Sequence, residues 1–384
     1  MATIPGTSGD DSLAGDGDDD VFEMADTGAD TVEGRGGNDS FEFGAFFGAG
    51  DRVDGGADVD TLQLSGDYSA GLLLSDANLH DVENVLLAAG GDYHFTIADD
   101  LVAAGVDYSI FGAGDITVDA SAAADGDMVV QTVDGTLDFT GCGGDDRLNV
   151  YDFTAGTRIH GGGGFNELNL HVGGNYVFDA DMMTGIDQIE VVISLPAPTR
   201  IVLTDGNVAA GEKMMIINLG GSGTMRVNGA KEKDGQLELH GAFTQTDTLI
   251  GGKGDDTLNG RGGDDLVVGG KGADRIVQDA GVGNDTVVYN RLSDSKQGRS
   301  DTIVGVDAGD VVDLSRLDAS KHQAADQAFV LVTELTGAEG EAMLEYDGGI
   351  LNRTTLTLET NGRAGADMVI FFEGDATDFT GLVL

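Results

Sequence analysis

Apolar residues recur at a fixed step of nine in one part of the chain. Residues 251–277 read GGKGDDTLN, GRGGDDLVV and GGKGADRIV, three consecutive copies of G-G-x-G-x-D-x-U-x in which U is a large apolar residue. Only Arg261 departs from this pattern. We expect each copy to form a six-residue turn followed by a three-residue strand whose apolar residue points into a narrow core. The apolar position falls on Leu249, Leu258, Val267, Ile276 and Val287.

An aspartate occupies the sixth position of every copy, at Asp256, Asp265 and Asp274. Asp247 continues the nine-residue step upstream, and Asp285 continues it downstream after a slip of two residues. If one coil uses two nonapeptides, the turns that face each other lie 18 residues apart. The pairs Asp247–Asp265 and Asp256–Asp274 have this spacing, and Asp265–Asp285 has 20.

A looser block of the same kind spans residues 6–63, and a solitary copy, GCGGDDRLN, spans 141–149. In the first block the aspartate spacings vary between 9 and 12, and the facing pairs Asp11–Asp30 and Asp20–Asp39 are both 19 residues apart. A flexible Gly/Asp linker is an alternative interpretation, weak for 251–277 and stronger for these two segments. The aspartates concerned are Asp11, Asp20, Asp30, Asp39 and Asp60, with Asp51 in a degenerate copy, and Asp146 in the solitary one.

A longer period indicates a tandem duplication of about 105 residues. GGADVDTLQL at 55–64 recurs as GGGGFNELNL at 161–170, and GGDDRLN at 143–149 recurs as KGDDTLN at 253–259. In the second copy Asn166 aligns with Asp60 and Thr157 with Asp51, so that copy has lost metal-type residues.

Between the glycine-rich blocks, short β-branched stretches with Gly and Asp punctuation predict strands, and 300–384 also reads mainly as strands. One short helix is an option around 319–328. We therefore expect an all-β fold, a parallel β-roll or β-solenoid with a β-rich C-terminal cap. The expected domains are an N-terminal β-roll (1–66), two degenerate solenoid modules (67–140 and 141–246), a calcium β-roll (247–290) and the cap (291–384).

The charge of the chain favours a cation as its partner. It carries 68 Asp and Glu against 20 Lys and Arg, a formal charge of −48. This balance argues against nucleic acid and anionic membranes as partners, since both require clustered basic residues. No apolar run is long enough for a transmembrane helix. The N-terminal sequence lacks the basic and apolar regions of a secretory signal peptide, so we expect export through another route.

The repeat combines the ligands that calcium prefers. Ca²⁺ takes about six to eight oxygen ligands from carboxylates and backbone carbonyls. The aspartates would stack along successive turns, while the glycines leave carbonyls accessible. Without an ion the stacked carboxylates would repel one another, so we expect calcium binding and folding to be one event. We expect the best-ordered sites at 247–288, ahead of 6–63, where each stack must accommodate extra residues.

These repeats resemble the RTX (repeats-in-toxin) proteins exported by type I secretion systems of Gram-negative bacteria. Residues 245–384, with SDTIVGVDAGDVVDLSRLDA, ADMVIFFEGD and the terminal DFTGLVL, resemble the C-terminal domain of serralysin-type proteases. The resemblance implies a β-roll, a cap with an uncleaved secretion signal, and carboxylate ligands at Asp256, Asp265 and Asp274. It also implies carbonyl ligands in the turns that begin at Gly251, Gly260 and Gly269 and contain Lys253, Gly262 and Lys271.

No catalytic motif accompanies these repeats. The sequence contains neither H-E-x-x-H nor G-x-S-x-G, and no two of its six histidines have zinc-ligand spacing. The pairs Asp145/Asp146 and Asp255/Asp256 follow from repeat register rather than from acid–base chemistry. We favour a secreted calcium-binding protein with a structural role at the cell surface or in the matrix. The alternatives are a surface-layer or adhesin subunit and a polysaccharide lyase or epimerase, whose basic residue would be Lys213, Lys231, Lys233, Arg200 or Arg226.

Overall fold

The computed structural model describes residues 2–24, 26–102, 105, 107–193, 197–220, 223–279, 282–322, 327–362 and 365–384. Within these residues the secondary structure is strands without helices, as the all-β prediction requires. None of the described residues forms a helix able to cross a membrane. The chain divides into two compact units, Met1–Val172 with Asp181–Asp187, and Gly173–Ala180 with Gln188–Leu384. The five expected domain boundaries stay predictions.

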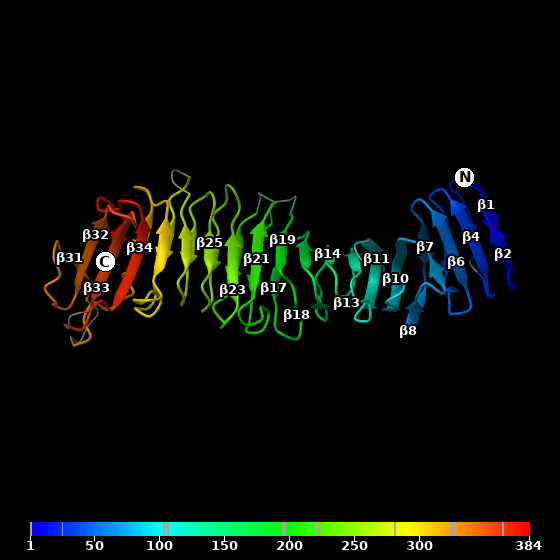
Figure 1. The fold of residues 1–384 in the computed structure, drawn as a ribbon, viewed down its shortest axis with the longest axis horizontal. Helices are drawn as coiled ribbons and strands as arrows, with labels where there is room; N and C mark the ends of the chain where they lie inside the picture. Colours follow the sequence, from blue (N-terminus) through cyan, green and yellow to red (C-terminus); the bar gives the residue numbers. More distant parts are fainter. Residues whose placement is uncertain are drawn as a thin grey trace. The chain divides into compact units, whose positions relative to one another are not determined.

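The first unit is built from parallel strands that pair with the equivalent strand one coil later, so that the chain winds as a β-solenoid (Figure 1). A β-strand buries alternate residues, and here those residues stack inside the coils. The main ladder contains β1 (Thr3–Pro5), β3 (Val21–Glu23), β5 (Ser40–Gly44), β7 (Thr61–Leu64), β10 (Asn84–Ile97), β11 (Asp107–Asp119), β12 (Asp127–Thr132), β14 (Arg147–Val150) and β16 (Glu167–Leu170).

Two further ladders complete this unit. The long strands β10 and β11 belong to two ladders, because their register shifts between Leu87 and Gly91. The second ladder contains β8 (Asp67–Leu74), β10, β11, β13 (Leu137–Thr140), β15 (Arg158–His160) and β18 (Met183–Thr184). The third contains β2 (Ser12–Ala14), β4 (Thr31–Gly36), β6 (Arg52–Ala57) and β9 (Leu79–His80).

The second unit has two parallel ladders. One contains β17 (Asn175–Val177), β20 (Thr199–Val202), β22 (Met225–Asn228), β24 (Thr248–Ile250), β26 (Leu266–Val268), β28 (Thr286–Val288), β30 (Val311–Asp313) and β35 (Leu382–Val383). The other contains β19 (Gln188–Val191), β21 (Lys213–Asn218), β23 (Gln236–His240), β25 (Thr257–Asn259), β27 (Arg275–Val277), β29 (Asp301–Val304) and β34 (Met368–Glu373).

An antiparallel cap ends the second unit. Strand β34 pairs with β33 (Arg353–Glu359), and β33 pairs with β32 (Glu341–Asp347), beside which β31 (Val330–Leu331) lies parallel (Figure 1). The switch from parallel to antiparallel pairing confirms the β-rich cap. Residues 319–322 and 327–328 are not helical, contrary to the short helix considered from the sequence, and 323–326 lie outside the described residues.

The nonapeptides have the predicted local structure. Strands β24 to β27 are three residues long, and turns of six residues separate them. Their central apolar residues are at most 1% exposed and stack in register from coil to coil. One column contains Leu249, Val267, Val287 and Val312, and the other contains Leu239, Leu258, Ile276 and Ile303.

Candidate metal centre

The aspartates that precede the strands form hydrogen-bonded ladders along the coils. In the second unit the backbone N–H of Asp247 donates to Oδ1 of Asp265 at 2.7 Å, and the N–H of Asp265 donates to Oδ1 of Asp285 at 2.9 Å. On the opposite side the N–H of Asp256 donates to Oδ1 of Asp274 at 2.9 Å. The structure therefore brings together each pair that the 18- and 20-residue spacings predict.

Two members of these ladders are not evident from the nonapeptide spacing. The N–H of Asp285 donates to Asp310, and the N–H of Asp274 donates to Asp301, both at 2.9 Å. Longer loops separate these pairs by 25 and 27 residues. The signal that could have identified them is local, because both begin an Asp-x-apolar triplet like that of Asp265.

The first unit contains the same arrangement. Its ladder bonds join backbone N–H groups to carboxylates at 2.7–2.9 Å, as short as those of the second unit. One series runs through Asp11, Asp30 and Asp51. The other runs through Asp20, Asp39 and Asp60 and ends on Glu83, which the repeat pattern does not predict. Spacings of 19 and 21 residues thus give the same ladder as a spacing of 18.

The second carboxylate oxygen divides the turns into two kinds. In some turns Oδ2 accepts a backbone N–H from four residues earlier, as Asp256 does from Gly252 at 2.6 Å and Asp20 does from Asp16 at 3.1 Å. In others Oδ2 is buried without a hydrogen-bond partner among the described residues. Four such aspartates follow nonapeptide turns: Asp39, Asp60, Asp265 and Asp274. Asp301, the ladder aspartate that follows a longer loop, has a buried Oδ2 without a hydrogen-bond partner as well.

Backbone conformation accounts for this division. In each of these four nonapeptide turns the residue four positions before the aspartate has a positive φ, which turns its N–H away from the carboxylate. These residues are Arg35 (φ 80°), Gly56 (98°), Arg261 (68°) and Gly270 (105°). The equivalent Asp16 and Gly252 do not have positive φ. A buried carboxylate oxygen without a donor requires a proton or a cation.

The first glycine of the repeat lies where oxygens from two coils converge. A Cβ on Gly251 would lie 2.5 Å from Oδ2 of Asp256 and closer still to the carbonyl oxygen of Gly269 in the next coil. The same holds at Gly34, next to Asp39 and the carbonyl of Gly55. Carboxylate and carbonyl oxygens around one small space are the donor set of a hard cation such as Ca²⁺. The residues present therefore fit calcium.

Comparison with family models agrees with this donor set. Residues 3–23 and 24–46 match the RTX calcium-binding nonapeptide repeat, and residues 205–384 match the C-terminal domain of M10 serralysin peptidases. The chain carries RTX calcium-binding repeats. RTX repeats bind Ca²⁺, and with the serralysin-type domain they indicate a calcium-binding protein that leaves the cell by type I secretion. A search of curated proteins finds no match.

The remaining predicted ligands occupy definite places in the RTX turns. Gly251, Gly260, Gly262 and Gly269 are buried, whereas the side chains of Lys253 and Lys271 are exposed. These two lysines can therefore offer backbone carbonyls to the turns, and their ammonium groups lie in solvent. The assignment of individual ligands stays a prediction. Among the other aspartates, Asp11 accepts from the N–H of Thr7, Asp247 from Ala242, and Asp30 and Asp285 each accept a ladder bond.

In the stretch that contains the solitary copy, side chains donate hydrogen bonds to the carboxylate and carbonyl oxygens. Asp146 donates its N–H to Asn166, whose Nδ2 donates to the carbonyls of Gly163 and Gly185 at 2.8 and 2.9 Å. The Cys142 thiol donates to Oδ1 of Asp146 at 2.9 Å, and burial raises the pKa of this thiol to about 12. The Asp146 carboxylate and the carbonyls of Gly163 and Gly185 therefore have protein donors, and the assignment of Asp146 as a metal ligand stays a prediction.

Burial makes the RTX carboxylates costly to ionise without a counter-ion. Desolvation, followed by repulsion from neighbouring carboxylates, raises the pKa of Asp265 to about 8. Burial likewise raises the pKa of Asp60 to about 7 and of Asp256 to about 7. In contrast, the N–H groups of Ala2 and Asp16 lower the pKa of Asp20. The turns thus differ in how strongly they favour a bound cation.

Proposed function

We propose that this protein is a structural component of the cell surface or extracellular matrix whose coils become ordered by calcium after export. The observation that carries the proposal is the set of buried carboxylate oxygens without hydrogen-bond partners, at Asp39, Asp60, Asp265 and Asp274. Each such oxygen favours a cation, and extracellular calcium modules typically bind at about 10⁻⁴–10⁻³ M. The chain would remain unfolded at the low calcium concentration of the cytosol and fold outside.

The test is a calcium titration of the full-length protein. Far-UV circular dichroism and the hydrodynamic radius should change together, from an expanded chain in chelator to a compact β-rich protein in millimolar calcium. Light scattering and electron microscopy then show whether the folded protein assembles. Unchanged spectrum and radius in chelator would contradict calcium-driven folding. A folded protein that neither assembles nor binds cell-surface material would contradict the structural role.

A second candidate function is the modification of acidic polysaccharides, supported by one cavity of the first unit. This cavity of about 350 Å³ is lined by Arg147, whose Nε lies 3.8 Å from Oε2 of Glu167, and by the exposed Phe165. Arginine can bind a sugar carboxylate, and an aromatic ring can pack against a sugar face. Its lining includes Asp107, Asp127, Asp145, Asp146 and Glu167. Turnover of an acidic polysaccharide that Arg147→Ala abolishes would favour this function over a structural one.

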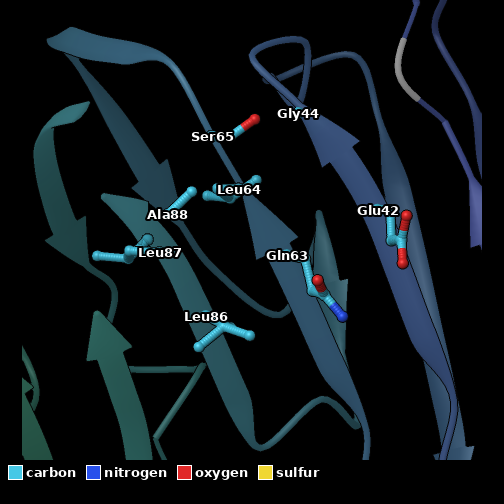
Figure 2. A pocket seen from close by; sticks show the side chains of 8 residues that line it. All are labelled: Glu42, Gly44, Gln63, Leu64, Ser65, Leu86, Leu87 and Ala88. Carbon is cyan, nitrogen blue, oxygen red and sulfur yellow. The ribbon is translucent and has the colours of Figure 1, made fainter. Parts of the chain in front are cut away.

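A second cavity of the first unit has a different character. It also measures about 350 Å³ and lies over β5, β7 and β10, where Glu42, Gln63 and Leu86 occupy adjacent register positions (Figure 2). Glu42 is the single ionisable side chain of its lining. Leu86 is 42% exposed there. A surface of this composition suits contact with another molecule better than acid–base chemistry, and so accords with the structural role.

A further inference from the structure

The coil that precedes the second-unit RTX ladders has no aspartate at the ladder position. Met225 and Leu237 occupy it, and they donate their N–H groups to Asp247 and Asp256 without offering a carboxylate of their own. The turn between β22 and β23 in this coil, residues 229–235, reads GAKEKDG and does not match the nonapeptide. Any cation held by this coil must therefore be bound by residues other than the repeat aspartates.

One carboxylate of this turn is buried without full pairing. Glu232 is 0% exposed, and its Oε1 accepts the N–H of Lys233 at 2.9 Å and that of Gly235 at 3.3 Å. Its Oε2 is buried and has no hydrogen-bond partner among the described residues. Ionised carboxylates are almost never fully buried unless they are paired or coordinate a metal.

Two more carboxylates converge with Glu232. One oxygen each from Asp205, Glu232 and Asp234 lie within 4.8 Å of one another. Asp205 belongs to the turn of the preceding coil, and the N–H of Gly211 in that turn donates to the carbonyl of Asp234 at 3.0 Å. The two turns that supply these carboxylates are thus joined by a backbone hydrogen bond.

We infer that Asp205, Glu232 and Asp234 form a calcium site outside the RTX repeats. The donor set consists of oxygen atoms alone, which favours a hard cation over zinc. Three carboxylates and the ammonium of Lys233, which pairs with Asp205, leave two negative charges for a divalent ion to neutralise. Asp205 and Asp234 are exposed, so water can complete the coordination.

The position of the site indicates what a bound ion would do. A Cβ on Gly252, in the first RTX turn, would lie 3.2 Å from Cβ of Glu232, so the site lies against that turn. An ion here would order the 229–235 turn and thereby support the N-terminal end of the RTX ladders. It would supply a cation to a coil that has no ladder carboxylate.

The experiment counts calcium ions bound to the full-length protein by equilibrium dialysis with calcium chloride alone. Glu232→Gln should bind one ion fewer than the parent chain while retaining its far-UV spectrum in saturating calcium. Glu334→Gln, an exposed position elsewhere in the same unit, is the matched control and should bind the full number. A Glu232→Gln protein that folds and binds the full number overturns the inference.

Two exposed variants decide the matter if Glu232→Gln does not fold. Asp234→Asn should lower the affinity for one ion about tenfold, and unchanged binding would overturn the inference. Lys233→Met should increase the affinity for that ion, because an ammonium no longer pairs with Asp205. A purely structural role for the lysine predicts no increase in affinity. Asp265→Asn should lose ladder ions and keep this one, so failure of the RTX ladders and failure of this site are distinguished.

Discussion

The RTX ladders of the first and second units have the same hydrogen bonds and different surroundings. In both, backbone N–H groups donate to stacked carboxylates at 2.7–2.9 Å, although the spacing of the aspartates differs. In the first unit Arg35 donates through Nη1 to the carbonyl of Gly15 at 2.9 Å, and backbone donors lower the pKa of Asp20. Burial raises the pKa of Asp60 in the first unit to about 7, and in the second unit it raises the pKa of more ladder carboxylates, among them Asp256, Asp274 and Asp265, the last to about 8.

This comparison separates two properties that the repeat motif combines. Stacking of the coils alone determines the ladder, because extra residues are absorbed in the turns and leave the ladder distances unchanged. The need for a cation depends instead on turn conformation and burial, which decide whether Oδ2 finds a donor. We therefore expect both units to bind calcium and the second to depend on it more strongly, which four experiments can check.

The largest effect is expected from removal of calcium. A ligand at a hundredfold its dissociation constant stabilises the folded state by about 2.7 kcal/mol per site, so chelation should unfold the coils with several sites. Hydrogen exchange should show loss of protection in β24 to β27 first and a smaller loss in β3 and β5. Equal loss in both regions would remove the distinction between them.

A smaller effect is expected from single ladder carboxylates. Asp265→Asn should weaken calcium binding about tenfold or more, because this residue has ladder partners on both sides and an unpartnered Oδ2. Asp20→Asn, in a first-unit turn of the other kind, should lower the unfolding free energy less and without loss of an ion, since the Oδ2 of Asp20 already has a backbone donor. Calorimetry of both variants would refute the comparison if their ion losses were equal.

Converting the stretch around Asn166 into an RTX-like one tests the comparison from the opposite direction. Asn166→Asp removes the amide that donates to Gly163 and Gly185, which places three oxygens together. In chelator this should lower the unfolding free energy by about 1–3 kcal/mol, and calcium should restore part of the loss while one additional ion binds. Thermal unfolding with and without calcium measures the loss of stability and its recovery. If calcium left the unfolding temperature of the variant unchanged, carboxylates alone would not create a site.

The smallest effect is expected from acidification in chelator. The pKa of Asp265 is about 8 in the folded coil and near 3.8 in the unfolded chain, so protonation favours the folded state. The ionisation penalty is absent below about pH 4 and complete above about pH 8. Strand signal should therefore increase between about pH 8.5 and pH 5.5 without calcium, mainly in the second unit. In the first unit Asp60, whose pKa is raised to about 7, contributes in the same direction, whereas Asp20, whose pKa is lowered, loses its stabilising contribution only below about pH 4.

Local structure and ladder partners could be derived from the sequence because both depend on short-range periodicity. The nine-residue step places Leu258 and Ile276 in one buried column and pairs Asp256 with Asp274, as the structure shows. The continuation to Asp301 and Asp310 could not be derived from that step, since loops of unequal length interrupt it. Glu232 could not be predicted as a site residue, because its turn departs from the repeat and a motif does not show which residues are buried.

The two kinds of turn could not be predicted from the sequence either. Glycine at the second repeat position permits either sign of φ, so Gly252 and Gly270 look alike in the motif and differ in the structure. Arg261, the one departure from the repeat, adopts a φ of 68° although arginine rarely does so. Stacking against the neighbouring coils, rather than the identity of the residue, therefore selects the conformation that leaves Oδ2 unpartnered.

The ladder bonds of the second unit also have a direction. Every N–H in them points to a carboxylate one coil nearer the C-terminus, and the series starts on Met225 and Leu237, which contribute a donor only. A C-terminal coil therefore serves as a template for the coil before it, whereas an N-terminal coil offers its successor no acceptor through this ladder. With the antiparallel strands β32 to β34 as a completed edge, assembly of this unit should propagate from its C-terminal end toward its N-terminal end, so a chain emerging C-terminus first could fold as it arrives.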